Sequence, residues 1–208
     1  MATLDLPPHA FAKDDPGDDS AFYAPPRLVT HIDAAATAVL TAFYATLLPA
    51  GAVVLDLMSS WVSHLPPERA YTVTGHGMNA TELAANPRLN GWFVQNLNRE
   101  PRLPLVDATF DAALCCVGVQ YLQRPVEVFA EIARVLRPGA PFVVSFSNRC
   151  FPTKAVAIWR ALDTSGHAAL VRRYLEQAGF GEVRTEVLAD GRRGDPLVAV
   201  TGRGCIPG

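Results

Sequence analysis

The chain has 208 residues, of which 50% are hydrophobic and 18% are charged, a balance typical of one large globular domain or two small ones. Its 18 Lys and Arg stand against 20 Asp and Glu, a net charge of −2. This balance argues against a dedicated nucleic-acid or polyanion binder, although a local basic pocket stays open. No apolar run approaches the roughly 18 residues of a membrane span, so no membrane partner is expected.

The amino-terminal residues form a distinct acidic and proline-rich stretch. Aspartates stand at 14, 15, 18 and 19, and prolines at 7, 8 and 16. This composition fits neither a secretory signal nor an arginine-rich transit peptide. We expect residues 1–29 to form an arm that is mobile or draped over the surface and that could act as a lid.

Four cysteines stand at positions 115, 116, 150 and 205. Cys115 and Cys116 are adjacent, so on a strand they would point to opposite faces and make a poor disulfide framework. No C-x-x-C pair or histidine pattern accompanies them, and we therefore expect no metal site. The cysteine pattern predicts a reduced, cytoplasmic protein.

In chain order, the first strong signal is a helix over residues 30–48, where apolar residues recur at helical spacing and Thr30 can cap the start. The apolar run 52–57 is suited to a buried parallel strand and is followed by a polar loop over 59–64. The next expected elements are a strand at 71–74, a short helix at 78–86, and strands at 92–95 and 110–117.

Residues 125–137 carry the clearest helix signal. Pro125 stands in the first turn, apolar residues share one face, and Arg137-Pro138-Gly139 ends the helix. The remaining expected elements are a strand at 141–146, a helix at 167–178, and strands at 183–188 and 197–200 around an Asp190-Gly191 turn.

The alternation of strands and helices predicts the fold class. We expect an α/β, Rossmann-like doubly wound fold, with a seven-stranded, mostly parallel sheet, one antiparallel strand and helices on both faces. Residues 30–208 would form this single domain. Ligands bind such sheets beyond the carboxyl ends of the strands, so the loops after the first four strands should converge on one crevice.

Three motifs in the second half of the chain carry a family resemblance. They are Leu103-Pro104-Leu105, then Phe110-Asp111 opening a strand, then Leu136-Arg137-Pro138-Gly139 between a helix and a strand. In this order they resemble the class I S-adenosylmethionine-dependent methyltransferases of the type 11 kind. The resemblance covers about residues 30 to 200 and implies S-adenosylmethionine as the cofactor.

The loop after the first strand departs from the family pattern. Members usually carry an acid and then small residues, close to D-x-G-x-G-x-G, so that the backbone approaches the methionine part of the cofactor. Here Asp56 is kept and every glycine is absent. Ser60 is small enough to allow approach, whereas Met58 and Val62 should not imitate glycine. Asp56 is equally suited to capping loop amides, and both roles can coexist.

The next two loops also differ from the family pattern. The acid that usually binds the ribose falls near Gly77, in Gly75-His76-Gly77-Met78-Asn79. Asn79 could offer an amide to a ribose hydroxyl, and Met78 could pack on the adenine. In the third loop, Asn96 could accept a hydrogen bond from the adenine amine, with Leu97 beside it. These loops are similar to those of a subgroup of methyltransferase-like proteins, which favours a coherent variant.

The resemblance extends the expected site to the loop after the fourth strand. That loop, with Val117, Gly118, Gln120 and Tyr121, often faces the transferable methyl group in the family. We expect Gln120 and Tyr121 to line the substrate pocket, and Val117 and Gly118 to contact the cofactor.

Further substrate contacts are expected from the segments that flank this crevice. The candidates are Tyr23, Arg27, Trp61 and Arg149. Packing of a capping helix, or a surface salt bridge of Arg149, explains the same residues equally simply.

The function that these signals favour is methyl transfer from S-adenosylmethionine to a small-molecule acceptor by in-line displacement. Positioning and desolvation suffice for such a reaction unless the acceptor must lose a proton. The candidate bases are then His64, His31 and Tyr121, although a lone histidine is more often a surface group.

Two other functions stay open at this point. The first is a catalytically inactive binding or regulatory protein on the same fold, which the missing glycines and acid favour. The second is a fold for another nucleotide, which the lack of G-x-G-x-x-G and of a P-loop disfavours. We expect a small-molecule substrate, no nucleic-acid partner, and a monomer or homodimer.

Overall fold

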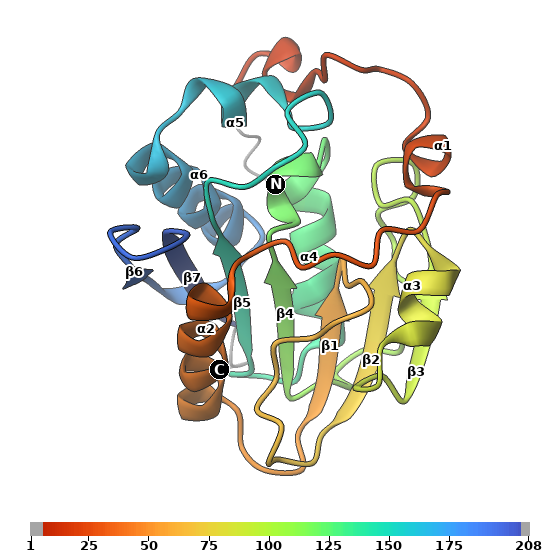
Figure 1. The fold of residues 1–208 in the computed structure, drawn as a ribbon, viewed down its shortest axis with the longest axis vertical. Coiled ribbons are helices and arrows are strands. Elements are labelled where there is room, and N and C mark those ends of the chain that lie inside the picture. Colours follow the sequence, from red (N-terminus) through yellow and green to blue (C-terminus); the bar gives the residue numbers. More distant parts are fainter. Residues whose placement is uncertain (1–5, 205–208) are drawn as a thin grey trace.

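The computed structural model describes residues 6–204, which form a seven-stranded sheet in the order β3-β2-β1-β4-β5-β7-β6 (Figure 1). All neighbouring strands from β3 to β5 pair in parallel, whereas β7 is antiparallel to both β5 and β6. The predicted fold class is therefore confirmed, including its single antiparallel strand. The strands are β1 (Val53–Leu57), β2 (Thr72–Gly77), β3 (Gly91–Val94), β4 (Ala112–Cys116), β5 (Pro141–Phe146), β6 (Gly181–Ala189) and β7 (Leu197–Arg203).

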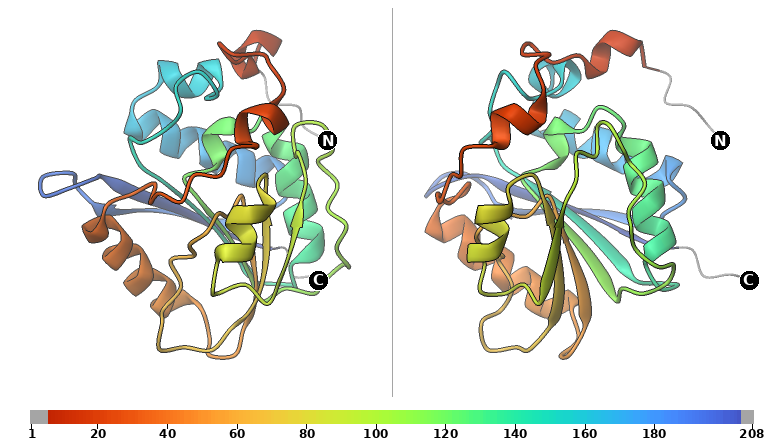
Figure 2. Two further views of the ribbon diagram at one scale, coloured as in Figure 1. Left: turned by 45° about the vertical axis from the view of Figure 1, so that its right-hand side comes forward. Right: turned by 90° about the vertical axis from the view of Figure 1, so that its right-hand side faces the viewer.

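Helices cover both faces of this sheet, as the right-hand view of Figure 2 shows. On one face, α4 and α6 pack against the strands through residues such as Phe129 and Tyr174. On the other face, α2 does so through Leu40 and Tyr44. The helices are α1 (Asp19–Tyr23), α2 (Ala34–Leu47), α3 (Ala80–Ala85), α4 (Pro125–Val135), α5 (Ala157–Ala161) and α6 (Thr164–Gln177), with 3-10 turns at Pro8–Phe11 and Val119–Tyr121.

Side chains of β4 alternate between the two cores because successive residues of a strand point to opposite faces. Cys115 lies in the core under α4 and α6, whereas Cys116 packs against the core under α2. Both are free thiols, as is Cys150; Cys205 lies outside the described residues. Burial raises the pKa of Cys116 to about 12, so this thiol stays protonated at neutral pH.

The amino-terminal arm crosses the carboxyl ends of the strands, at the top of Figure 1. Ion pairs hold it there: Asp19 pairs with Lys13 at 2.6 Å and with Lys154 at 3.3 Å. Lys154, in the segment after β5, is fully buried and also donates to the carbonyl of Gly17 at 2.9 Å. The arm thus covers the edge of the sheet where ligands bind in this fold class.

Several element boundaries differ from the sequence-based expectations. The first long helix begins at Ala34 and not at residue 30, because Asp33, rather than Thr30, accepts the capping bond from the backbone N–H of Ala36. Strand β2 continues to Gly77 because it pairs with β3 up to that residue. The sequence analysis missed α1 and α5, which have five residues each and are too short to show a helical period.

No helix within residues 6–204 combines the length and the apolar composition that crossing a membrane requires.

Candidate functional site

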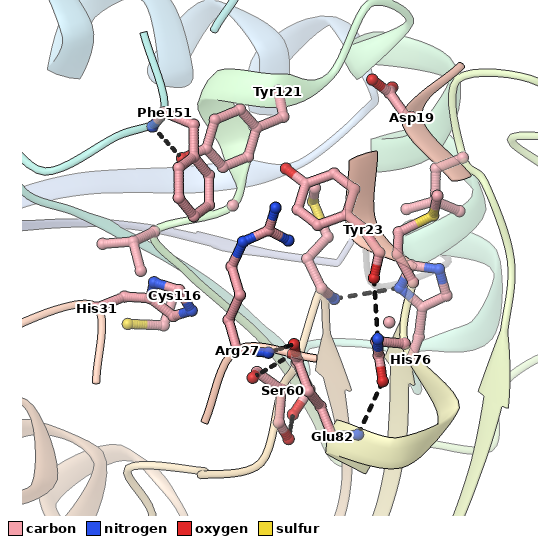
Figure 3. Close-up of a pocket in the computed structure, with 18 of the residues that line it drawn as sticks. Asp19, Tyr23, Arg27, His31, Ser60, His76, Glu82, Cys116, Tyr121 and Phe151 are labelled. Carbon is pink, nitrogen blue, oxygen red and sulfur yellow. Dashed lines mark hydrogen bonds between the residues drawn. The ribbon is translucent and has the colours of Figure 1, made fainter. Parts of the chain in front are cut away.

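A cavity of about 260 Å³ lies at the carboxyl ends of the strands, where the fold prediction expected the ligand (Figure 3). We call it the main cavity. The loops after β1, β2, β3, β4 and β5 all contribute to its wall, and arm residues between Asp19 and His31 close it from above. Five loops that lie far apart in the sequence therefore share one binding volume, because parallel strands end at the same edge of the sheet.

The loop after β1 is held by His76, a buried residue of β2. The backbone N–H of Met58 donates to Nδ1 of His76 at 3.1 Å, and that of Ser59 donates to the His76 carbonyl at 2.6 Å. Because Nδ1 accepts, Nε2 carries the proton and donates to the carbonyl of Gln95 at 3.0 Å. Burial lowers the pKa of His76 to about 4, which keeps the ring neutral in this role.

Met58 and Val117 adopt left-handed backbone conformations beside the main cavity. Their φ angles are +56° and +46°, which cost a residue with a Cβ roughly 1–3 kcal/mol each. Met58 stands where D-x-G-x-G-x-G has its first glycine. The backbone of Met58 thus adopts a conformation that glycine favours, so the expectation that Met58 cannot imitate glycine is wrong in this respect. Its side chain, unlike a glycine, covers Gly118.

The loop after β2 offers no carboxylate at the position of the usual ribose acid. A Cβ added at Gly77 would lie 2.5 Å from the carbonyl oxygen of Ser59, so no larger side chain fits there without movement. The Asn79 carboxamide is used inside the protein, since it caps α3 and donates to the carbonyls of Tyr23 and Ala24 at 2.9 Å each. This loop therefore fastens the arm as well as lining the main cavity.

Glu82, in the first turn of α3, is the carboxylate that follows β2 on the wall of the main cavity. It accepts from the Ser60 hydroxyl at 2.7 Å and from the backbone N–H of Arg27 at 2.6 Å. Glu82 thus links the loop after β1 to the arm across the mouth of the main cavity.

Aromatic side chains from three segments gather at the other end of the main cavity. The rings of Tyr23, Tyr121 and Phe151 lie with centroids 6.0–6.5 Å apart. The Tyr121 hydroxyl accepts from the backbone N–H of Phe151 at 2.9 Å. Figure 3 shows the Arg27 guanidinium extending into the space between these rings.

The sequence comparisons agree with this architecture. A methyltransferase domain family matches residues 58–144. The biotin biosynthesis bifunctional protein BioHC of Teredinibacter turnerae is 31% identical over 84 residues, which are 38% of this chain and 15% of that protein. Over residues 58–144 the chain is thus similar to methyltransferase domains.

Solved structures of low sequence identity share the fold of this chain. A methyltransferase from Methanosarcina mazei aligns with a TM-score of 0.55 at 17% identity, over 79% of this chain and 98% of its own. Phosphoethanolamine N-methyltransferase 2 of Haemonchus contortus, with S-adenosylmethionine, aligns at 0.58 and 12% identity, over 81% of this chain and 52% of its own. The cyclase SpnF aligns at 0.59 and 16% identity, over 81% of each chain, so the fold alone does not fix the reaction.

Most of the expected cofactor contacts of this family lie on the main cavity. Its wall includes Met58, Ser60, Gly77, Met78, Asn79, Asn96, Leu97, Val117 and Gly118. Asp56 and Gly75 do not belong to this wall. Gly75 lies under Leu89, whose Cδ1 would be 2.4 Å from an added Cβ.

Asp56 and His64 line a second, smaller cavity beneath the loop after β1. It has a volume of about 30 Å³ and shares His31, Met58 and Ser60 with the main cavity. The Asp56 carboxyl accepts from the hydroxyls of Ser59 at 2.7 Å and Ser63 at 2.5 Å, while burial raises its pKa. The loop-capping interpretation of Asp56 thus describes its observed contacts.

Two of the expected substrate contacts point elsewhere. Trp61 donates its indole N–H to the carbonyl of Val29 at 2.9 Å, and Gln120 donates to the carbonyl of Val117 at 2.8 Å. Neither lines the main cavity, whereas Tyr23, Arg27 and Arg149 do. Arg149 is paired with Asp195 at 2.9 Å.

The candidate bases differ in their titration. Burial lowers the pKa of His31, so its ring is neutral at pH 7 and able to accept a proton. Burial raises the pKa of Tyr121 to about 12, so its phenol stays protonated. His64 has a pKa lowered to about 4 by burial and by His31, and it faces the second cavity.

Sequence reasoning missed several residues of the main cavity, among them Asp19, His76, Glu82 and Phe151. Asp19 belongs to the arm, and Phe151 lies in an irregular segment without a period. His76 and Glu82 did carry a signal, because both lie in the short stretch after the second strand that the motif comparison covered.

Proposed function

We propose that this chain transfers a methyl group from S-adenosylmethionine to a small-molecule acceptor, with both bound in the main cavity. The observation that supports the proposal best is the position of this cavity. It lies where the loops of a class I methyltransferase sheet meet, and it is enclosed by the arm.

The residues present suit the cofactor in spite of the altered loops. Met58 keeps a glycine-like backbone and leaves a volume of about 260 Å³ in the main cavity, whereas Val62 borders only the second cavity. Met78 and Leu97 would pack on the adenine, and the Asn96 carboxamide would meet its edge. We assign the adenosyl group to the end of the cavity formed by these three residues.

When bound, the cofactor supplies a sulfonium methyl that is already a good electrophile, so the chain need only bind, orient and exclude water. Because both the arm and the loop after β5 cover the cavity, the reaction would proceed away from bulk water. His31, neutral at pH 7, would take up the proton of an acceptor that must lose one.

A second candidate function is a binding or regulatory protein without catalysis. One observation in its favour is that the backbone N–H groups of Met58 and Ser59 already donate to His76, so they are not free for a cofactor. It is also favoured by Gly77, where the family's ribose acid has no room. In this case the cavity would bind the cofactor, its product or another nucleoside and use it as a signal.

Calorimetric titration with S-adenosylmethionine and S-adenosylhomocysteine tests the proposal. We expect micromolar binding of both and a loss of about tenfold in Met78→Ala, while Val106→Ala, exposed and away from the cavity, binds normally. No binding at millimolar ligand would refute a cofactor role. Binding without turnover of a broad panel of acceptors would favour the regulatory protein.

The proposal includes the location, the partners and the oligomeric state of the protein. We propose a cytoplasmic protein that acts on a small molecule, has no nucleic-acid or membrane partner, and exists as a monomer or homodimer. Light scattering coupled to size-exclusion chromatography measures the oligomeric state.

A further inference from the structure

The charged side chains around the main cavity differ in whether they have an ionic or hydrogen-bonded partner. Asp19 pairs with lysines, Arg149 pairs with Asp195, and Glu82 accepts two hydrogen bonds. The guanidinium of Arg27 makes no ion pair within residues 6–204. It donates to the carbonyls of Phe22 at 2.9 Å and Pro25 at 3.5 Å. A guanidinium has five N–H donors, so Arg27 keeps donors free for a ligand.

Aromatic rings set the position of this guanidinium. Its carbon lies 4.5 Å from the ring centroid of Phe22, 5.4 Å from that of Phe151 and 5.9 Å from that of Tyr23. Cation–π attraction holds the group in place. An unpaired cation in such surroundings attracts an anion more strongly than it would in water.

We propose that the methyl acceptor is a small aromatic carboxylic acid. Its carboxylate accepts hydrogen bonds from Arg27, and its ring packs among Tyr23, Tyr121 and Phe151. The inference rests on the proposed function and names the substrate class of the same cavity. A fork of two N–H donors matches a carboxylate, and this arrangement makes Arg the preferred residue for such groups.

The charged side chains that line the cavity restrict the net charge of the acceptor. A cationic amine would meet Arg27 at close range and be repelled. A phosphate dianion would face the carboxylate of Glu82, which lines the same cavity. A monoanion satisfies the single unpaired guanidinium without an excess of negative charge.

The cofactor also has a carboxylate, on its methionine part, and this is the competing partner for Arg27. A carboxylate of the acceptor can be distinguished from that of the cofactor because 5′-methylthioadenosine has the nucleoside and the sulfur but no carboxylate. If Arg27 serves the acceptor, Arg27→Gln should leave the affinities for S-adenosylhomocysteine and for 5′-methylthioadenosine within about twofold of the wild type.

The test measures binding of benzoate, benzamide and phenyl phosphate by calorimetry, with and without saturating S-adenosylhomocysteine. We expect benzoate to bind at least tenfold more tightly than the other two. Arg27→Gln should reduce benzoate to the affinity of benzamide, and Arg27→Lys should restore part of the difference. Arg124→Gln, an exposed arginine paired with Glu127, is the matched control and should change nothing.

Three results would overturn the inference. The first is equal affinity for benzoate and benzamide, and the second is no benzoate binding at millimolar concentration. The third is that Arg27→Gln loses affinity for S-adenosylhomocysteine but keeps its affinity for 5′-methylthioadenosine. Absence of S-adenosylhomocysteine binding in the wild type refutes the proposed function instead, and the titration of benzoate alone still reports on Arg27. Circular dichroism and urea unfolding verify that each variant is folded.

Discussion

At the scale of single residues, one buried imidazole joins two of the loops that line the main cavity. His76 receives the Met58 amide and passes a hydrogen bond on to Gln95, so it joins the loops after β1 and β3. Neighbouring Gly77 lets the Ser59 carbonyl come close. The residues at positions 58, 76 and 77, which differ from the family pattern, thus lie together in the structure and belong to one set of contacts.

Low pH should lower the free energy of unfolding because His76 is buried in its neutral form. Its pKa falls from 6.5 to about 4 on folding, so the folded state binds fewer protons than the unfolded chain within this window. The free energy of unfolding is therefore highest above pH 6.5 and drops as the pH falls toward 4, by roughly 3 kcal/mol from this residue.

Urea unfolding between pH 4.5 and 7.5, about the range of this titration, measures the loss. In His76→Asn, the amide oxygen can still accept from the Met58 amide but does not titrate, so the pH dependence should become shallower. Burial also lowers the pKa values of His64, His31 and His167, so His64→Gln combined with His76→Asn should make the pH dependence shallower still without abolishing it. An unchanged slope in His76→Asn would contradict this assignment.

Gly77 tolerates no Cβ, in contrast to Gly91 in the adjacent strand. A Cβ at Gly77 would meet backbone at 2.5 Å, whereas nothing lies within 4 Å of one at Gly91. We expect Gly77→Ala to lower the free energy of unfolding by about 1–3 kcal/mol and Gly91→Ala to change it by less than about 0.5 kcal/mol. Equal effects in urea unfolding would show that the Ser59 carbonyl moves freely.

At the scale of elements, the arm is positioned by ions rather than by a core of its own. Its short helix α1 contributes Asp19, whose carboxylate meets Lys13, Lys154 and the Asn98 amide. Lys154 is also 2.9 Å from the Asp15 carboxylate. Aromatic contacts accompany these pairs, among them Phe11 with Tyr174 and Phe22 with Phe151. Because the ion pairs meet at buried Lys154 and Asp19, local opening of the arm should still depend on charge.

Lys154→Met should therefore release the arm. Removing one partner of a buried ionic group costs about 3–5 kcal/mol. Since the arm can open locally, hydrogen exchange and proteolysis in residues 6–33 should increase at least about 100-fold, with a smaller change in global unfolding. Arg172→Met, which breaks an exposed pair with Glu176, is the control and should have almost no effect. An arm that stays protected in Lys154→Met would mean that packing holds it.

At the scale of the whole molecule, the sheet places five loops around a single cavity, so one ligand touches segments from residue 19 to residue 151. A ligand that binds only the folded chain stabilises all of these segments together. The stability of the entire domain is then a measure of cavity occupancy.

S-Adenosylhomocysteine should raise the melting temperature. At 100 times its dissociation constant, a ligand adds about 2.7 kcal/mol, which for a domain of this size is about 5–11 °C. Thermal unfolding followed by circular dichroism measures the shift. NAD, whose G-x-G-x-x-G motif the sequence lacks, serves as the control and should produce none. No shift with S-adenosylhomocysteine at millimolar concentration would contradict cofactor binding.

Much of the fold was predictable because it depends on local pattern. The apolar run of β5, Pro141–Phe146, matches its predicted bounds, and Pro125 begins α4 as expected. The predicted crevice also coincides with the main cavity, since the carboxyl ends of parallel strands must share an edge. Elements of five residues, such as α1 and α5, left no period to detect.

The sequence by itself determined the order of strands and helices, the sheet's single antiparallel strand, and which loops would meet. Local apolar period and turn residues carry that information. Only the tertiary structure decided that Asn79 binds the arm, that Asp56 faces a second cavity, and that Arg27 has no ionic partner among the described residues. Asn79 bonds residues more than 50 positions away, Asp56 depends on which cavity its side chain reaches, and Arg27 depends on which charged groups the fold brings near it. No spacing along the chain encodes these facts.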